Sequence, residues 1–330
     1  MDKVQLIHGD GGEYTSELIK DIFYSNFSND ILLQEMDSGI FKINSERLAF
    51  TTDSFIIDPI FFRGGDIGRL SICGTINDLT VCGAYPLYLS ASFIIEEGFP
   101  ISKLKDIVSS MNKTCSEAKV KIITGDTKVV EKGKTDGIFI NTAGIGVIDK
   151  FSPKKIEPGD SIIITGTIAE HGTAIAVDRY ELDIHGDIRS DCEPLNHLLS
   201  YLLKYEEGIK LMRDPTRGGI GQVLNEISRK SNLGIHLFKE NIPIRREVKA
   251  INEMLGLDPL YLASEGRIII IADKSISEEI KNELQSTCGC QEASILGYFT
   301  EEERLVYIEN SIGGRRILNG LDFQMLPRIC

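Results

Sequence analysis

The chain divides at Phe151-Ser152-Pro153-Lys154-Lys155-Ile156-Glu157-Pro158-Gly159-Asp160, a run that combines two prolines, a glycine and charged side chains. Proline and glycine interrupt helices and strands, so this run predicts a junction between domains. At roughly 150 residues per domain, a length of 330 residues also suggests two domains. We therefore expect an N-terminal domain over residues 1–150, a C-terminal domain over 151–309 and a tail over 310–330.

Strand and helix patterns alternate on both sides of this junction. Before it, the pattern predicts helices over 15–23, 67–82 and 102–118 and strands over 48–52, 88–95, 120–124 and 136–147. After it, the pattern predicts strands over 161–165, 267–272, 294–299 and 304–309, and helices over 169–180, 194–206 and 275–286 and one that ends near 231. The alternation indicates α/β or α+β layers.

Composition and charge narrow the classes of partner. Hydrophobic residues make up 42% of the chain and charged residues 26%, as in soluble globular proteins. The net charge is −13 and the sequence shows no basic stripe, which argues against nucleic acid as a partner. The sequence has no apolar run of bilayer length and no signal-peptide pattern, so we expect a cytoplasmic protein without a membrane partner. The scattered Cys73, Cys82, Cys115 and Cys192 indicate buried free thiols in a reducing compartment.

Three aspartates stand out by their surroundings. Asp53 and Asp126 each follow a β-rich segment beside Thr or Ser, and Asp78 lies inside an apolar helical pattern. Ligands collect beyond strand ends in open α/β layers, and Mg²⁺ takes carboxylate oxygens together with phosphates and waters. The set therefore suggests a Mg–nucleotide site, with Lys128 close enough to reach a phosphate. Turn chemistry accounts for Asp53 or Asp126 alone, whereas Asp78 needs either an exposed helix face or a cation.

Two glycine-rich segments are candidate anion sites. Gly9-Asp10-Gly11-Gly12 follows a short apolar segment, and its spacing matches neither a Walker A loop nor a dinucleotide fingerprint. A plain turn and a phosphate clamp are both compatible with it. Gly218-Gly219 opens a predicted helix beside Thr216 and Arg217, where backbone N–H groups favour an anion.

The chain ends in a thiol, at Leu326-Pro327-Arg328-Ile329-Cys330. Pro327 keeps the approach extended, and Arg328 is a candidate source of the positive field that a thiolate needs. Two interpretations remain open from these residues alone. One is a frayed terminus with an incidental cysteine, and the other is a tethered thiol that enters a pocket and leaves it again.

Nine strings, taken together, resemble one family. They are His8-Gly9-Asp10-Gly11-Gly12, Thr51-Thr52-Asp53-Ser54-Phe55, Gly64-Gly65-Asp66-Ile67-Gly68, Asn77-Asp78-Leu79, Glu96-Glu97-Gly98, Gly125-Asp126-Thr127-Lys128-Val129-Val130, Asp214-Pro215-Thr216-Arg217-Gly218-Gly219, Glu265-Gly266 and Pro327-Arg328-Ile329-Cys330. In order, and over essentially the whole chain, the set is similar to the HypE family of carbamoyl dehydratases in nickel–iron hydrogenase maturation. The aspartate strings also resemble the wider superfamily of aminoimidazole ribonucleotide synthetase, selenophosphate synthetase and thiamine-monophosphate kinase. The Pro-Arg-Ile-Cys ending is what points to HypE.

The resemblance implies a two-domain, synthetase-like α+β fold. The N-terminal domain would dimerise through its sheet with ATP near that interface, and the C-terminal α/β domain would carry a mobile tail. Cys330 would be the modified thiol. The residues implied for ATP and Mg²⁺ are Asp53, Asp78 and Asp126, Thr127 beside them, Asp37 as a weaker metal candidate, and Gly9, Gly11 and Gly12 as a phosphate cover.

Two positions depart from the family pattern. Arg63 stands where a proline is expected, and Ser264 stands where an asparagine is expected. Ser264 adjoins Glu265, which we expect beside the tail. A shorter side chain at this position would loosen the hold on the tail.

The activity implied by the resemblance is an ATP-dependent dehydration. The carbamoyltransferase HypF would load a carbamoyl group onto Cys330, phosphorylation would turn the amide oxygen into a leaving group, and a thiocyanate would result. Lys128 or Arg217 would add positive charge, and the HypC–HypD scaffold would receive the cyanide. Glu265 is the expected base, with His8 and His171 as weaker candidates. A structural ion pair between Glu265 and Arg267 is the competing interpretation.

Two other functions stay open from sequence. One is a small-molecule kinase or synthetase of the same superfamily, which would not need Cys330. The other is a carrier that binds a metal through Cys330 and performs no catalysis.

Overall fold

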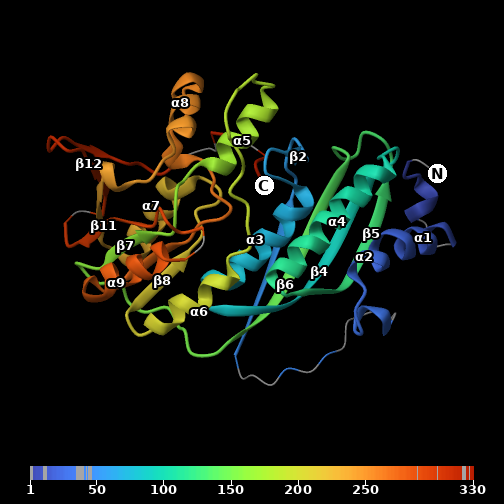
Figure 1. Cartoon of the computed structure of the whole chain (residues 1–330), viewed down its shortest axis with the longest axis horizontal. Helices are drawn as coiled ribbons and strands as arrows, with labels where there is room; N and C mark the ends of the chain where they lie inside the picture. The colour runs from blue at the N-terminus through green and yellow to red at the C-terminus, as the bar shows by residue number, and fades with distance from the viewer. Residues whose placement is uncertain are drawn as a thin grey trace.

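The computed structural model describes residues 3–9, 13–34, 41, 43, 47–287, 289–302, 304–321, 325–326 and 328–330. Figure 1 shows two domains side by side, with the C-terminus between them, near β2 and α5, and the N-terminus at the far end of the first domain. The α+β two-domain architecture expected from the sequence is confirmed.

The N-terminal domain is built on a four-stranded sheet. In spatial order its strands are β1 (Leu48–Phe55), β6 (Ile138–Ile148), β4 (Ala84–Glu96) and β5 (Lys121–Val130). The β1–β6 and β6–β4 pairs are antiparallel, and β4–β5 is parallel. A parallel pair requires a crossover connection, which α4 (Ile101–Ala118) provides.

Helix α3 (Ile67–Val81) packs against the sheet and is almost entirely buried. Asp66 caps it as predicted, because its Oδ1 accepts from Gly68 N at 2.7 Å and from Arg69 N at 3.1 Å. Gly74 lets the helix approach β1, since a Cβ there would lie 2.9 Å from Cζ of Phe55. This close approach brings the end of β1 beside the middle of α3.

Short elements complete the N-terminal domain. Before β1 come η1 (Leu6–Gly9), α1 (Glu13–Leu18), the π-helix η2 (Ile19–Tyr24), α2 (Ser25–Phe27) and η3 (Leu32–Gln34), which bear out the helix predicted over 15–23. The Phe23 ring packs against Phe93 of β4 at 4.8 Å between centroids. A hairpin of β2 (Phe61–Phe62) and β3 (Gly65–Asp66) leads into α3.

The C-terminal domain is a mixed seven-stranded sheet with helices packed on it. In spatial order the strands are β13 (Arg315–Ile317), β12 (Val306–Glu309), β9 (Gly234–Phe238), β11 (Ser294–Thr300), β7 (Ser161–Ile164), β10 (Ile269–Ala272) and β8 (Ile209–Arg213). Its helices are α5 (Glu170–Arg179), α6 (Leu199–Leu202), α7 (Gly219–Ser231), α8 (Arg246–Leu255) and α9 (Lys274–Gln285), with the short η4 (Asn196–Leu198), η5 (Leu203–Tyr205), η6 (Lys239–Asn241) and η7 (Pro259–Tyr261).

Three sequence predictions need correction. The single helix expected over 194–206 is a succession of short turns, η4, α6 and η5. Strands β8, β9 and β13 were not predicted. Cys82 is exposed where a buried thiol was expected, because it follows the last residue of α3 and lies beyond the helix face that packs on the sheet.

One buried amide links the two domains close to the cavity residue Asp78. Asn77 of α3 donates to the backbone carbonyls of Glu193 at 3.1 Å and Glu265 at 3.0 Å, and accepts from Leu195 N at 2.8 Å. Because all three contacts cross from the N-terminal to the C-terminal domain, the backbone of Glu265 is tied to the helix that carries Asp78.

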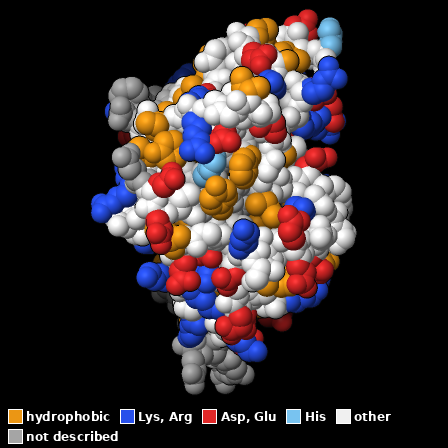
Figure 2. Space-filling model, turned by 90° about the vertical axis from the view of Figure 1, so that its left-hand side faces the viewer, with side chains coloured by type: hydrophobic (Ala, Val, Ile, Leu, Met, Phe, Trp, Pro, Cys, Tyr) orange, Lys and Arg blue, Asp and Glu red, His pale blue; other side chains and the backbone are white. Residues whose placement is uncertain are grey.

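The surface carries charges of both signs. Figure 2 views the end formed by the C-terminal domain, where Lys and Arg alternate with Asp and Glu and small apolar patches lie between them. In the part of the chain that the structure describes, no helix has both the length and the apolar character that a membrane span requires.

Candidate active site

A cavity of about 180 Å³ lies where the two domains meet the tail. It gathers the end of β1, the middle of α3, the segment before α7, the segment before β10 and the final residue. Its lining is Thr52, Asp53, Phe55, Gly74, Asp78, Asp214, Thr216, Arg217, Glu265 and Cys330. The arrangement places a thiol among four acidic side chains and one guanidinium group.

Asp53 and Asp78 enter the cavity from the N-terminal domain. Asp53 Oδ1 accepts from Ser54 N at 2.8 Å, and Asp78 Oδ2 accepts from Thr51 Oγ1 at 2.8 Å. Burial raises the pKa of both carboxyls despite these bonds, and the charge of Asp53 raises the pKa of Asp78 further. A bound cation would stabilise such a pair, because it offsets the negative charge of the two carboxylates.

Asp214 adds a third carboxyl that the sequence analysis did not single out. Burial and the charge of Asp78 raise its pKa to about 6. Among the described residues, no three acidic, His or Cys side chains lie close enough to enclose a metal ion by themselves. The donor set nevertheless fits Mg²⁺, which keeps waters and phosphate oxygens among its ligands and needs only one or two carboxylates.

Glu265 is buried in the cavity wall with its Oε1 unpaired among the groups that the structure describes. Burial, followed by the charges of Asp214 and Asp191, raises its pKa well above the usual range. Asp191 fixes the local backbone by accepting from Glu265 N at 3.1 Å and Gly266 N at 3.3 Å. A buried carboxyl with a raised pKa and a free oxygen is suited to taking up a proton.

Arg267 does not neutralise this carboxyl. Its guanidinium lies 3.1 Å from Glu193, 3.8 Å from Asp191 and 3.9 Å from Glu170. The alternative in which Glu265 forms a structural pair with Arg267 is therefore not what the structure shows. Arg267 holds a separate acidic cluster together behind the cavity.

Cys330 is protonated in this position. Burial, and then the charge of Glu265, raises the pKa of its thiol to about 12, although Arg217 opposes the shift. The sequence suggested Arg328 as the source of positive field, but its Nη1 binds Asp136 at 2.6 Å. Arg217 is the cation in the cavity lining, so the expectation for Arg328 was wrong.

Asp126 and Lys128 lie away from this cavity. They form an exposed ion pair of 3.1 Å on β5, at the edge of the sheet opposite to β1. The register places Asp126 beside Ser92, Ser92 beside Asn141 and Asn141 beside Ser54. With strands about 4.8 Å apart, Asp126 is three strands, or about 14 Å, from the end of β1. Within one chain, the structure does not bring Asp126, Thr127 or Lys128 to Asp53 and Asp78.

Several predicted residues lie outside the described part of the chain or outside the cavity. Gly11, Gly12 and Asp37 are outside the described residues, and Gly9 ends η1. His8 is buried in a local turn, where its Nδ1 accepts from Gln5 N at 2.9 Å. Both weaker base candidates are thus engaged elsewhere, because His171 Nε2 bonds to the carbonyl of Ile329 at 2.8 Å.

Helix α7 begins beside the cavity in the way that its glycines predicted. Gly218 and Gly219 both have positive φ, 78° and 58°. A Cβ on Gly219 would lie 2.6 Å from the carbonyl oxygens of Leu260 and Leu262, so only glycine fits there. This close packing positions Arg217 at the cavity.

The two departures from the family pattern have visible partners. Ser264 Oγ accepts from Ala169 N at 2.9 Å in a fully buried position. Arg63 donates from its backbone N to Asp178 Oδ2 at 2.7 Å and from Nε to Oδ1 at 2.6 Å. Proline lacks the backbone N–H that the first of these bonds uses.

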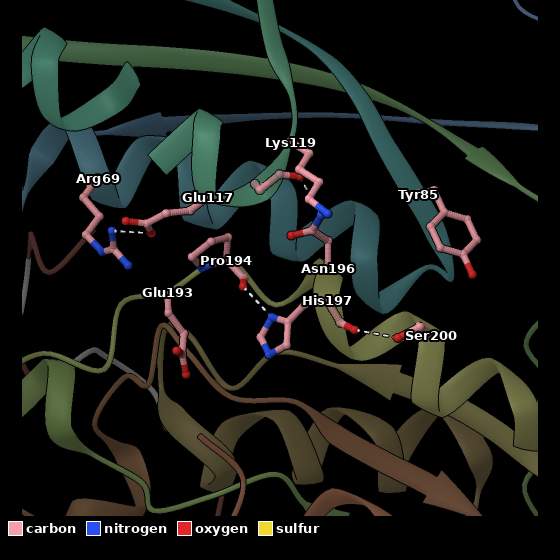
Figure 3. Close-up of a pocket in the computed structure, with 10 residues that line it drawn as sticks. Arg69, Tyr85, Glu117, Lys119, Glu193, Pro194, Asn196, His197 and Ser200 are labelled. Atoms are coloured by element: carbon pink, nitrogen blue, oxygen red, sulfur yellow. Dashed lines mark hydrogen bonds and ion pairs between the residues drawn. The ribbon is translucent and has the colours of Figure 1, made fainter. Parts of the chain in front are cut away.

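A second hollow, of about 410 Å³, opens elsewhere between the domains (Figure 3). Arg69 and Glu117 form an ion pair of 2.9 Å at one end of the view, and His197 Nδ1 bonds to the carbonyl of Pro194 at the centre. The lining of this hollow combines basic and acidic side chains. It contains no cysteine, so it has no counterpart of the thiol and carboxyl groups around Cys330.

Known proteins match nearly the whole length of the chain. Residues 35–148 match the N-terminal domain of AIR synthase related proteins, and residues 157–309 match the C-terminal domain of the same family. The carbamoyl dehydratase HypE of Bradyrhizobium diazoefficiens is 44% identical over 99% of this chain and 96% of that protein. The carbamoyl dehydratase HypE of Escherichia coli is 39% identical, with both proteins covered in full.

Solved structures agree with these relatives. HypE crystallised in complex with ATP superposes with a TM-score of 0.94, at 40% identity and over 99% of both chains. The HypE chain of a HypE–HypF complex gives a TM-score of 0.81 at 43% identity, over 92% of this chain and 99% of that one. Thiamine monophosphate kinase of Aquifex aeolicus, at 16% identity and a TM-score of 0.63, shares the fold alone. The chain belongs to the carbamoyl dehydratase HypE family of hydrogenase maturation enzymes, within the AIR synthase related proteins.

Proposed function

We propose that this enzyme uses ATP to dehydrate a carbamoyl group carried on the sulfur of its own Cys330, forming a thiocyanate that supplies cyanide for the hydrogenase iron. The observation that supports this proposal is the position of Cys330, which lines the same cavity as Asp53, Asp78 and the unpaired oxygen of Glu265. The relative crystallised with ATP supports a nucleotide in this chemistry.

The chemistry runs in two steps that conserve every atom. The carbonyl oxygen of the S-carbamoyl group attacks the γ-phosphorus of ATP, and ADP leaves. Glu265 takes one of the two protons of the amide nitrogen. The C–O bond then breaks, and the departing phosphate carries the second proton away as hydrogen phosphate. The remaining nitrogen and carbon form the C≡N bond of the thiocyanate on Cys330. Phosphate replaces hydroxide as the leaving group, which removes the main barrier to dehydration.

The residues of the cavity divide this work. Asp53 and Asp78, with Asp214 beside them, would hold Mg²⁺, which neutralises charge on the transferring phosphoryl group when it is bound. Arg217 offsets negative charge near the sulfur. The docked tail would place the activated carbamoyl group between the two domains, which limits the access of water to it.

The raised pKa of Cys330 bears on how the tail is loaded. A thiol with a pKa of about 12 is a poor nucleophile at neutral pH, because the thiolate is the reactive form. Carbamoyl transfer therefore takes place with the tail outside the cavity, where the thiol recovers an ordinary pKa. The solved complex of a HypE relative with HypF supports HypF as the loading partner. The HypC–HypD scaffold is the proposed acceptor of the cyanide.

A second copy of the chain is proposed to pack on the open face of the N-terminal sheet. That face carries exposed apolar side chains, with Phe50 at 74% exposure and Leu48 at 47%. Asp126, Thr127 and Lys128 lie on β5 of this sheet, so they would reach a nucleotide only across such a dimer. Because the reaction consumes ATP and needs a reduced thiol, we place the enzyme in the cytoplasm.

Mass spectrometry of the C-terminal peptide tests the proposed function. After incubation with HypF and its carbamoyl donor, the peptide should gain one carbamoyl group, and after addition of Mg–ATP it should lose one water. Cys330→Ala should bind ATP and gain nothing, whereas Cys82→Ala, which removes an exposed thiol, should behave like the wild type. A small-molecule kinase would ignore the loss of Cys330, and a metal carrier would bind a soft metal without nucleotide.

A further inference from the structure

The docked tail is held through its backbone by the segment that follows β1. Ile56 N donates to the backbone oxygen of Cys330, and Asp58 N donates to the carbonyl of Arg328, both at 3.3 Å. In return, Arg328 Nε donates to the carbonyl of Ile56 at 3.1 Å. The backbone of the tail is therefore bonded to this segment on both sides of Ile329, with a turn in the chain at Arg328, whose φ is 52°.

The C-terminal domain supplies the other hydrogen bonds to the tail, through two side chains of α5. His171 Nε2 is 2.8 Å from the carbonyl of Ile329, and Arg179 Nη2 donates to the carbonyl of Arg328 at 2.7 Å. Arg179 Nε also donates to the carbonyl of Asp58 at 2.8 Å. The backbone oxygens of the last three residues thus all accept hydrogen bonds, and the donors come from both domains.

The surroundings of His171 fix which of its nitrogens carries the proton. Cys192 N donates to Ser190 Oγ at 3.1 Å, which leaves the Ser190 hydroxyl hydrogen free to point at His171 Nδ1, 2.8 Å away. The imidazole is fully buried, its pKa is lowered by burial, and the Phe62 ring meets it edge-on at 5.4 Å. A neutral ring that accepts at Nδ1 donates at Nε2, which is the atom that faces Ile329.

The side chains of the tail complete the fit. Leu326 and Ile329 are buried against Gly218, Leu262 and Ala263, and only about 10 Å³ stays free between them. Arg328 reaches Asp136 at 2.6 Å. Good packing alone sets a tail in a groove, whereas directional bonds to successive carbonyls also set how far the last residue extends into the cavity.

We propose that His171 and Arg179 are positioning residues, which clamp the backbone of the tail so that the Cys330 sulfur rests between the acidic cavity wall and Glu265. Neither side chain lines the cavity, so they act through the tail. The chemical consequence rests on the proposed function: with the clamp weakened, the loaded tail would leave the cavity more often and dehydrate more slowly.

Alkylation of Cys330 tests the clamp without nucleotide or partner. Iodoacetamide reacts with the undocked thiol, and the exposed Cys82 of the same chain serves as an internal reference for reagent strength. His171→Leu removes one buried hydrogen bond, so the alkylation rate of Cys330 relative to Cys82 should rise about 5–10-fold. His171→Gln places an amide N–H near the position of Nε2 and should restore most of the protection.

A matched control and a second variant make the result decisive. His236→Leu removes another buried histidine, one that bonds to Tyr298 and not to the tail, and should leave the ratio unchanged. If His171→Leu does not fold, Arg179→Leu, at a partly exposed position, decides the question in the same assay. A folded clamp variant that alkylates Cys330 at the wild-type rate would overturn the proposal.

The activity measurement separates the clamp from the function. With S-carbamoylated chains, His171→Leu should slow a single turnover of dehydration while the Kd for ATP stays at the wild-type value. If the wild type shows no ATP-dependent dehydration, the proposed function fails, and the alkylation ratio still decides whether the clamp exists.

Discussion

Glu265 and Cys330 line one cavity between the domains, and the negative charge of Glu265 helps to keep the Cys330 thiol protonated. Glu265→Gln removes that charge, so the pKa of the docked thiol should fall below about 12. The pH profile of Cys330 alkylation should therefore shift to lower pH. In the same variant, dehydration should slow by about 10²–10⁴-fold, the range for loss of a general base, while carbamoyl loading by HypF continues. Unchanged dehydration would remove Glu265 from the mechanism.

Asp53→Asn and Asp78→Asn should weaken binding of Mg–ATP and stabilise the protein without ligand. Burial raises the pKa of both carboxyls, and the charge of Asp53 raises the pKa of Asp78 further, so the ionised forms are destabilised in the empty cavity. Each variant should show a higher Tm without nucleotide and a smaller rise in Tm when Mg–ATP is added. Asp106→Asn, on the exposed face of α4, is the matched control and should change neither value. Equal nucleotide-induced shifts in all three variants would contradict the assignment.

Glu170 makes stability depend on pH. Burial and the charge of Asp191 raise its pKa from 4.5 to about 7. The folded chain thus binds more protons at this site than the unfolded chain between these two values, so stability falls as pH rises through the window. Glu170→Gln should flatten the decline of the free energy of unfolding between about pH 4.5 and 7, as measured by urea titration. An unchanged slope would show that another group causes the decline.

Arg63 and Asp178 should be energetically coupled. Asp178→Ala loses both the bond from Arg63 N and the bond from Arg63 Nε, whereas Arg63→Ala loses only the second. Urea unfolding should show a loss of about 1–3 kcal/mol for Asp178→Ala and a smaller loss for Arg63→Ala. The exposed pair Lys249–Glu253, at 4.0 Å, is the reference. Its double-mutant cycle should give a coupling energy of less than about 0.5 kcal/mol. Arg63→Ala as costly as Asp178→Ala would refute this account.

The sequence predicted the parts of this architecture that depend on local chemistry. The cap at Asp66 and the helix that carries Asp78 follow from neighbouring residues, and the structure has both. Asp53 and Asp126 were expected just after their strands, but both lie inside them, because β1 and β5 continue beyond these residues. Strand β13 escaped prediction because its three residues, Arg315–Ile317, are exposed and mostly charged, and β9 (Gly234–Phe238) because His236 interrupts its short apolar run.

The arrangement of the site was harder to predict, because it depends on strand order and on contacts between domains. Asp126 resembles Asp53 in its local sequence, but two strands separate β5 from β1. Asp214 was not predicted as a site residue, because Thr216 and Arg217 beside it gave the stronger signal. Its carboxyl belongs to the site because α3 brings Asp78 close to it. The bond from His171 to the tail spans two distant parts of the chain, and no sequence spacing reveals it.

Isotope transfer from the carbamoyl oxygen tests the central claim most directly. A chain with S-carbamoylated Cys330 carrying ¹⁸O in its carbonyl is mixed with Mg–ATP for a single turnover, and both the phosphate and the C-terminal peptide are weighed. The account predicts that the label appears in inorganic phosphate. The mass of the peptide, which now carries the thiocyanate, should fall by the mass of one labelled water. Label that stays on the peptide, or that leaves in water while the phosphate stays unlabelled, would contradict it.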